Sequence, residues 1–300
     1  MSLKSALGGV KQLANGTTIP IIGLGTWQIG KDGKNSDAEI RAALTAGYRN
    51  IDTAHIYVNE DQLGLSLEKI LPELKLTRQD IFLQTKVPIL DKDTEAVVEK
   101  SIKQSLAHLK TDYLDSVLIH YPGDRVNGNI NDYETNKKNR KIVWQILEKY
   151  YESGVIKAIG VSNYEVYHLV ELFEYAKVKP ALNQVEYHPY FTRPTLKAFC
   201  ERHGIYFQAF SSLALGDKKL IAEPAVTALA TKYNTSPQTI LYAFPFSVGA
   251  GLIPKSNTPS RIATNLTDVA KIHLTKEEVA SLLALDKNAG FTDCTPWTML

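Results

Sequence analysis

The sequence has few of the features that mark a secreted, membrane-bound or nucleic-acid-binding protein. Its 300 residues include two cysteines, Cys200 and Cys294, which are too few for a disulfide framework and indicate a reducing compartment. No stretch is long and apolar enough to span a bilayer, and residues 1–4 lack the apolar core of a signal peptide. The net charge of +2 gives no reason to expect nucleic acid or an acidic membrane as a partner. We therefore expect a cytoplasmic protein.

The chain also lacks metal-ligand spacing and any boundary of linker composition. Its 44% hydrophobic and 22% charged residues describe an ordinary globular protein. A barrel of alternating strands and helices typically takes about 250 residues as one domain. We therefore expect residues 1–300 to form a single domain, with no metal, acting as a monomer.

Short apolar runs alternate with helical patterns along most of the chain. An Asn-Gly turn at residues 15–16 predicts a β-hairpin over residues 10–21. One strand is expected to end at Asp52 and a second to run to Lys86. Further strands are expected over residues 116–119, 156–161, 181–185, 205–210, 251–253 and 269–274. Helices are expected over residues 36–46, 61–71, 93–109, 142–152, 166–176, 194–202 and 224–233, from 236, from 258 and over 275–285. The polar residues 122–141 read as a long exposed loop. Eight strands alternating with helices predict an α/β fold, a (β/α)8 TIM barrel with an N-terminal β-hairpin cap, and a doubly wound open sheet is the alternative.

Three of the expected strands each deliver one ionisable side chain at the carboxyl end. Asp52, Lys86 and His120 follow one another at intervals of 34 residues, which is about the length of one strand-helix unit. Tyr57 lies five residues after Asp52. Because the carboxyl ends of barrel strands carry the active site, we expect these four side chains to meet there.

These four residues suit a site for a carbonyl oxygen. A phenol is a weak acid, with a free pKa of about 10, and a neighbouring lysine ammonium would lower that pKa. Asp52 would balance the charge of Lys86, Tyr57 would act as general acid, and His120 would donate a hydrogen bond to the same oxygen. The alternative is structural, because Asp-Lys pairs at strand ends are often plain salt bridges.

A carbonyl site without a metal needs a hydride cofactor. The glycines at positions 23 and 25 suggest a dinucleotide fingerprint, but Gly30 lies five residues past Gly25 rather than three. We instead expect this segment to be a loop whose residues approach a ligand. Its ligand-facing members would be Gly25, Thr26 and Trp27.

The best phosphate-binding candidate follows the expected strand at 251–253. Lys255 is a cation at the strand end, Ser256 and Asn257 offer hydrogen bonds, and a helix begins just beyond them. Arg261 and Asn265 share one face of that helix. Arginine suits the 2′-phosphate of NADPH, and no acid that would favour NADH lies between Lys255 and Asn265. A solvated basic edge is the alternative.

The sequence resembles the aldo-keto reductases over nearly its whole length. The matching stretches are Gly23-Leu24-Gly25-Thr26-Trp27, Asp52-Thr53-Ala54 with Tyr57, Thr85-Lys86-Val87, Leu118-Ile119-His120, Gly160-Val161-Ser162-Asn163, Asn183-Gln184-Val185-Glu186-Tyr187-His188-Pro189 and Ile253-Pro254-Lys255-Ser256. The resemblance implies a (β/α)8 barrel that reduces aldehydes and ketones with NADPH, as an oxidoreductase of the alcohol dehydrogenase or aldehyde reductase type.

The resemblance also implies roles for individual residues. Tyr57 would be the acid, tuned by Lys86 and Asp52, with His120 orienting the carbonyl. The cofactor would be held by Ser162, Asn163 and Gln184 at the nicotinamide amide, Phe210 stacked on its ring, Ser211 and Leu213 at the pyrophosphate, and Lys255, Ser256, Asn257, Arg261 and Asn265 at the adenosine end. Substrates would meet Trp27, Tyr57, His120, Tyr121 and Trp297. Phe210 stands where the family usually has tyrosine, and Tyr121 stands where tryptophan is common.

Two other classes of function stay open at this point. Relatives of such barrels serve as nucleotide-bound sensor subunits, and others accumulate as structural, crystallin-like proteins. Both could bind the cofactor and show little turnover.

Overall fold

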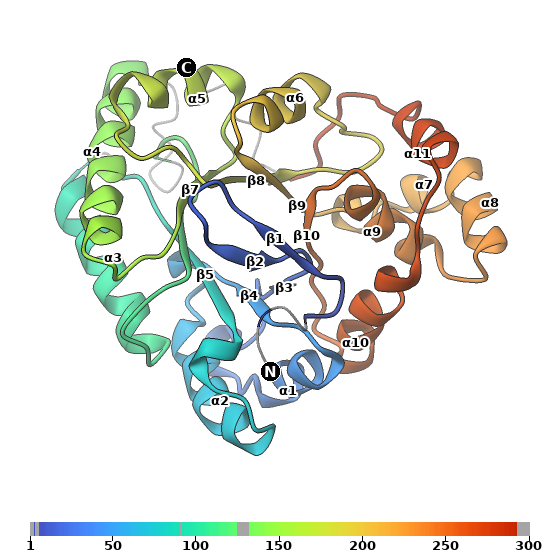
Figure 1. The fold of residues 1–300 in the computed structure, drawn as a ribbon, viewed down its shortest axis with the longest axis horizontal. Coiled ribbons are helices and arrows are strands. Elements are labelled where there is room, and N and C mark those ends of the chain that lie inside the picture. The colour runs from blue at the N-terminus through green and yellow to red at the C-terminus, as the bar shows by residue number, and fades with distance from the viewer. Residues whose placement is uncertain (1–2, 4–5, 91, 125–131, 293–300) are drawn as a thin grey trace.

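A closed barrel of parallel strands forms the centre of the molecule, and helices surround it (Figure 1). The computed structural model describes residues 3, 6–90, 92–124 and 132–292. Within these residues the barrel strands are β3 (Leu24–Gly25), β4 (Asn50–Asp52), β5 (Phe82–Val87), β6 (Ser116–Ile119), β7 (Ile159–Ser162), β8 (Leu182–Glu186), β9 (Tyr206–Phe210) and β10 (Gly251–Ile253). Each strand pairs in parallel with the next in sequence, so the (β/α)8 prediction is confirmed.

The first and last strands close the barrel. The β3 segment lies alongside β10, with bridges joining Ile22 to Leu252 and Gly25 to Lys255. The Gly25 amide donates to the Pro254 carbonyl at 2.9 Å. A closed sheet leaves no edge strand unpaired. Closure also brings the residues after β3 next to the residues after β10, although 230 positions separate Gly25 from Lys255 in sequence.

The helices form because each has an apolar face that packs on the barrel or on a neighbouring helix. They are α1 (Asp37–Ala46), α2 (Glu60–Glu73), α3 (Thr94–His108), α4 (Tyr133–Glu152), α5 (Val166–Tyr175), α6 (Pro194–Arg202), α7 (Lys218–Ile221), α8 (Pro224–Lys232), α9 (Pro237–Ser247), α10 (Pro259–Thr267) and α11 (Lys276–Leu283). Helix α1 buries Ile40, Ala43 and Leu44 and ends at Gly47, whose φ of 109° turns the chain toward β4. No helix in the described part of the chain has the length and apolar character needed to cross a bilayer.

The predicted N-terminal hairpin is present and covers the amino ends of the barrel strands (Figure 1). It consists of β1 (Val10–Gln12) and β2 (Thr18–Pro20). Its Leu13 and Ile19 side chains pack in one buried cluster with Phe82, Leu118 and Leu182 from three barrel strands. The hairpin therefore seals the end of the barrel opposite the predicted site.

The prediction of a strand at residues 269–274 is wrong. Residues Val269–Lys271 form a 3-10 helix, and Val269 is buried against the core. The missing barrel strand is β3, in the glycine-containing segment that we expected to be a loop. Two residues flanked by glycines give no strand pattern in the sequence, and β3 exists because strands on both sides supply its hydrogen bonds.

The prediction of a loop over residues 122–141 is wrong in its second half. Helix α4 begins at Tyr133, and Asp132 caps it by accepting a hydrogen bond from the Thr135 amide at 3.0 Å. Residues 125–131 lie outside the described part of the chain. The first turns of α4 bury polar side chains, Asn136 and Arg140 among them, so the helix shows no apolar periodicity there.

The contact between α2 and α3 leaves no room for a side chain at Gly64. A Cβ at this position would lie 1.9 Å from the His108 carbonyl oxygen. We expect Gly64→Ala to lower the free energy of unfolding by at least about 2 kcal/mol, because overpacking outweighs the better helix propensity of alanine. Urea denaturation provides the measurement. Leu65→Ala, at an exposed position of the same helix, is the control, with a change of about 0.5 kcal/mol or less. A Gly64→Ala protein as stable as the parent would contradict this packing.

Candidate active site

Four side chains predicted to act together lie at the carboxyl end of the barrel. Asp52 is the last residue of β4, Lys86 lies in β5, and His120 directly follows β6. Tyr57 ends a short 3-10 helix, His55–Tyr57, in the connection from β4 to α2. The structure therefore places all four on the same rim, as the strand spacing predicted.

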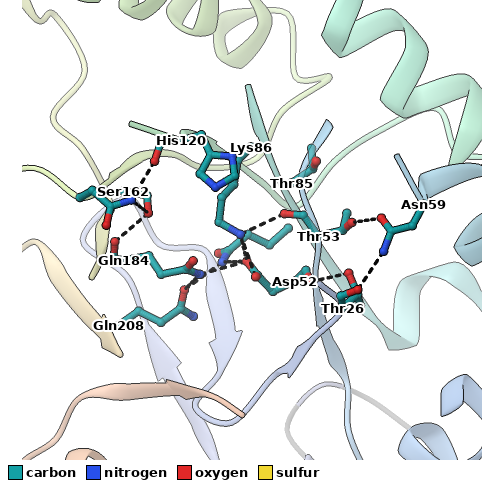
Figure 2. Close-up of polar contacts among 12 residues, drawn as sticks. Thr26, Asp52, Thr53, Asn59, Thr85, Lys86, His120, Ser162, Gln184 and Gln208 are labelled. Atoms are coloured by element: carbon teal, nitrogen blue, oxygen red, sulfur yellow. Dashed lines mark hydrogen bonds and ion pairs between the residues drawn. The ribbon is translucent and has the colours of Figure 1, made fainter. Parts of the chain in front are cut away.

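Lys86 and Asp52 form a buried ion pair (Figure 2). The Lys86 ammonium donates to both Asp52 carboxylate oxygens at 2.7 Å and to the Thr53 carbonyl at 3.0 Å. Burial lowers the pKa of Lys86, and the charge and hydrogen bonds of Asp52 oppose that shift. Three acceptors match the three hydrogens of an ammonium group. This cation is therefore held in one position beneath the rim.

Tyr57 lies beside both Lys86 and His120. The Lys86 amine is 5.4 Å from the centre of the Tyr57 ring, and the Tyr57 and His120 rings meet edge to face at 5.6 Å between centroids. Tyr57 and His120 are partly exposed, whereas Lys86 is buried. A small ligand entering the rim can therefore reach the phenol and the imidazole but not the ammonium.

Asn59 fixes the segment that carries Tyr57, and sequence reasoning missed it. Its amide nitrogen donates to the Thr26 carbonyl at 2.8 Å (Figure 2). The same nitrogen donates to the Ile29 carbonyl at 2.7 Å. Its side-chain oxygen accepts from the Thr53 hydroxyl at 3.0 Å. Asn59 is fully buried and so joins the loops after β3 and β4. The signal available in the sequence was the place of Asn59 directly before α2, four residues ahead of the first buried apolar residue, Leu63.

Val58, between Tyr57 and Asn59, has left-handed backbone angles. Its φ is 53°, and its side chain is 77% exposed. A β-branched residue is rarely found in this region, because its Cβ substituents crowd the backbone. The three hydrogen bonds of Asn59 on one side and the 3-10 turn on the other impose this conformation.

The three residues predicted to hold a carboxamide group come together next to His120. The Asn163 amide donates to the His120 carbonyl at 2.9 Å and to the Ser162 hydroxyl at 3.1 Å. The Ser162 hydroxyl donates to the Gln184 carbonyl at 2.8 Å. The buried Asn163 side-chain oxygen has no hydrogen-bond partner in the described part of the chain. An unpaired buried acceptor fits a ligand that brings its own N–H donor.

The segment after β9 carries Phe210, Ser211 and Leu213, which are each partly exposed. Ser211 has a φ of 53°, and its hydroxyl oxygen is buried without a hydrogen-bond partner in the residues described. Ala214 and Leu215 also have positive φ values, so the chain turns sharply here without glycine. The free Ser211 hydroxyl fits the predicted contact with a phosphate oxygen.

The predicted adenosine-end residues lie after β10 and on the first turns of α10. Lys255 donates to the Gln28 side chain at 3.1 Å and lies 5.6 Å from the centre of the Trp27 indole. Burial lowers the pKa of Lys255. Asn257 and Arg261 are exposed, whereas Ser256 and Asn265 are partly buried. The barrel closure thus joins the two segments that were predicted separately to meet the cofactor.

The predicted substrate wall is present in part. Trp27 is 51% exposed at the rim, while Tyr121, directly after His120, is 7% exposed. Trp297 lies outside the described residues. In that part of the chain we find no cluster of three or more histidine, cysteine or acidic side chains that could hold a metal ion.

Glu186 holds the last described residues against the rim. Its carboxylate accepts hydrogen bonds from the Phe291 amide at 2.8 Å, the Thr292 amide at 3.1 Å and the Thr292 hydroxyl at 2.6 Å. The His188 ring nitrogen lies 3.0 Å from the same carboxylate. Sequence reasoning placed Glu186 at the end of its strand but gave it no partner. The strand and the tail are more than 100 positions apart in sequence.

Comparison with known proteins reveals extensive similarity to a single family. The family model described as "Aldo/keto reductase family" matches residues 21–287. A Dictyostelium discoideum protein named aldose reductase B is 36% identical over 290 residues, which cover 93% of this chain and 92% of that protein. Glyoxal reductase of Bacillus subtilis is 35% identical over 286 residues, covering 95% and 96%. A crystal structure of a Bombyx mori aldo-keto reductase in complex with NADP has a TM-score of 0.83, with 32% identity and 96% of each chain covered.

The Glu186 contacts predict that acid weakens the attachment of the tail, Phe291 and Thr292, to the Glu186 carboxylate. Burial disfavours the charged form of Glu186, but hydrogen bonds from His188, Thr292 and Phe291 outweigh burial and lower the pKa of Glu186. A lowered folded-state pKa means that the contact stabilises the tail above the ordinary glutamate pKa and is lost as pH falls through the lowered value. We expect Glu186→Gln to speed amide hydrogen exchange at Phe291 and Thr292 by about tenfold or more at pH 7.

Exchange measured by mass spectrometry checks this expectation, with the tail peptide compared with peptides from α1. Glu277→Gln, at an exposed position of α11, is the control and should leave tail exchange unchanged. Equal tail protection in the Glu186→Gln and parent proteins would contradict a carboxylate anchor.

Proposed function

The chain belongs to the aldo/keto reductase family, and we propose that it reduces aldehydes and ketones to alcohols with NADPH as the hydride donor. The observation that carries the proposal is the placement of Tyr57 beside both the buried Lys86 ammonium and the His120 imidazole. The relatives are consistent with it. Aldose reductase B and glyoxal reductase have names that describe carbonyl reduction, and the Bombyx mori enzyme was crystallised with NADP.

In the proposed reaction the bound nicotinamide supplies the hydride to the carbonyl carbon. Tyr57 gives its phenolic proton to the carbonyl oxygen, so that the product leaves as a neutral alcohol. His120 donates a hydrogen bond to the same oxygen as negative charge develops on it. The Lys86 ammonium stabilises the phenolate that remains on Tyr57, and Asp52 keeps Lys86 charged in its buried position.

The residues around the rim fit the proposed cofactor. Among the residues described, the buried side-chain oxygen of Asn163 and the buried hydroxyl of Ser211 have no hydrogen-bond partner, and a carboxamide and a phosphate would satisfy them. Gln184 would share the carboxamide with Ser162 and Asn163, and Phe210 would stack on the nicotinamide ring. At the far end, Lys255, Ser256, Asn257, Arg261 and Asn265 would hold the adenosine and its 2′-phosphate.

The proposed substrates are carbonyl compounds with apolar bodies. Trp27 presents half of its surface at the rim, and Ile56 and Val58 are exposed beside Tyr57 in sequence. In the proposal these side chains would contribute an apolar mouth to the site. The curated relatives named here act by name on a sugar aldehyde and on glyoxal, so the shared chemistry lies at the carbonyl rather than in the body of the substrate.

Removal of one hydroxyl tests the acid assignment. We expect Tyr57→Phe to lower kcat for a panel of aldehydes by at least about a hundredfold, because the proton donor is lost. NADPH binding, measured by quenching of tryptophan fluorescence, should not change. Absorbance at 340 nm measures turnover, and Tyr133→Phe at an exposed position of α4 is the control. Normal turnover in Tyr57→Phe would refute the assignment. A parent protein that binds NADPH but reduces no aldehyde would favour a sensor or structural role.

The basic residue on α10 predicts the choice of cofactor. With NADPH and NADH assayed side by side, we expect lower KM for NADPH in the parent protein. Arg261→Ala should raise the KM for NADPH by about tenfold to a hundredfold and leave that for NADH unchanged, because a charged hydrogen bond to the 2′-phosphate is lost. Lys276→Ala, another exposed cation, serves as the control. Equal effects on both cofactors would place the phosphate contact elsewhere.

A further inference from the structure

Three glutamine side chains meet inside the barrel beneath the Lys86–Asp52 pair. Gln84, Gln184 and Gln208 come from β5, β8 and β9, and their exposed fractions are 0%, 2% and 0%. Figure 2 shows Gln184 and Gln208 directed toward Asp52 from the opposite side of the barrel. Sequence reasoning gave Gln84 and Gln208 no role, and the proposed reaction does not use them.

The three amides and the Asp52 carboxylate form a closed ring of hydrogen bonds. Gln84 donates to Asp52 Oδ1 at 2.7 Å and to Gln208 Oε1 at 2.8 Å. Gln184 donates to the same two oxygens, at 2.9 Å and 2.8 Å. The two amide nitrogens therefore bridge one carboxylate oxygen and one carbonyl oxygen. We call these four residues the amide ring.

The chemistry of the ring fixes which way each amide faces. If either Gln84 or Gln184 were flipped, its carbonyl oxygen would face the Asp52 carboxylate and the Gln208 carbonyl, which are both acceptors. Each donor therefore commits both amide hydrogens to the ring. Gln208 takes part through its oxygen, because its Nε2 has no hydrogen-bond partner in the described residues.

The ring acts on both halves of the site. Asp52 Oδ1 accepts two amide hydrogens in addition to its contact with Lys86, so part of its charge is balanced from below and its plane is held facing the ammonium. With both hydrogens of Gln184 committed, Oε1 is the polar side-chain atom that it can offer to a ligand. A primary carboxamide would donate an N–H group to that oxygen.

We propose that Gln84 and Gln208 are positioning residues for carbonyl reduction, which hold the Asp52 carboxylate against Lys86 and fix Gln184 as an acceptor for the cofactor. This proposal depends on the proposed function. Gln84 and Gln208 are fully buried, so they would act through Asp52 and Gln184 rather than by contact with substrate or cofactor. The titratable groups that face Lys86 are Asp52, Glu60 and Tyr57, and the Tyr57 ring in turn contacts His120.

The direction of the effect follows from charge balance. Without the ring, the whole Asp52 charge would fall on Lys86, and the ammonium would stabilise the Tyr57 phenolate less. The pKa of the phenol would then rise. Alcohol oxidation, the reverse reaction, needs the phenolate, so its activity would require higher pH. We expect Gln208→Leu to shift the rising limb of that pH profile upward by about 0.5 to 1 unit and to lower kcat by about tenfold.

A matched variant separates the acceptor role from simple packing. Gln208→Glu keeps a carbonyl oxygen, and beside Asp52 in a buried position its carboxyl should stay protonated and neutral. We expect it to retain kcat within about threefold and an unchanged pH profile, because Gln208 uses its oxygen alone. Leu182→Met, another barrel-interior change outside the ring, should behave like the parent.

A double-mutant cycle gives the decisive result. If the ring acts as a unit, Gln84→Leu combined with Gln208→Leu should lower kcat about as much as either single change. The urea midpoints of the same four proteins should also be non-additive, and this readout does not depend on turnover. Additive losses in both measurements would overturn the proposal, as would a Gln208→Leu protein with an unchanged pH profile. If a leucine variant does not fold, Gln84→Met and Gln208→Met replace the pair.

The outcomes distinguish this proposal from the proposed function. A parent protein that reduces no aldehyde refutes the function, while non-additive urea midpoints would still report the ring. A parent that is active, with additive variants, refutes the positioning role and leaves the function intact.

Discussion

The buried contact between the Lys86 ammonium and the Asp52 carboxylate is the interaction on which the rest of the site depends. A charge without a partner inside a protein is very costly, so each of these groups requires the other. Neighbouring parallel strands make the contact possible. Asp52 pairs in register with Gln84, and Lys86 lies two residues further along the same face of β5. Its long side chain can therefore reach the carboxylate while its backbone stays in the sheet.

Closure of the barrel adds a second group of residues, around Lys255, to the rim that carries this ion pair. The pairing of β3 with β10 brings Trp27 and Gln28 against Lys255, so one wall of the rim is built from the two ends of the barrel sequence. Asn59 then joins the loop after β3 to the loop that carries Tyr57. A displacement of β3 would therefore also move the segment that carries Tyr57, because this buried amide joins them.

The sequence was sufficient to predict the fold class and the residues that strands deliver to the rim. Asp52, Lys86 and His120 were predictable because each follows an apolar run, and parallel strands place their carboxyl ends together. β3 was not, since two residues between glycines gain their strand conformation entirely from their neighbours. The start of α4 was not predictable from apolar periodicity, because its buried face carries the polar residues Asn136 and Arg140.

Contacts that join distant parts of the chain were equally hidden. Glu186 and Thr292, or Gln84 and Gln208, are more than 100 positions apart, and nothing local distinguishes them from other polar residues. Interior glutamines are the clearest case. In the alternating pattern of a half-exposed strand a glutamine reads as solvent-facing, and only the closed barrel reveals that Gln84 and Gln208 point inward.

The barrel interior has an apolar layer on the hairpin side and a polar layer on the side of the site, and this arrangement explains why the amide ring is tolerated there. At the amino ends of the strands, Phe82, Leu118 and Leu182 pack with Leu13 and Ile19 of the hairpin, and this apolar layer separates the interior from solvent on that side. Lys86 and Asp52 must then find their hydrogen-bond partners within the protein, because water cannot reach them from below. Amide side chains supply such partners without adding charge. The hairpin and the glutamines are therefore two parts of one solution: the first removes water from beneath the ion pair, and the second replaces the hydrogen bonds that water would have made.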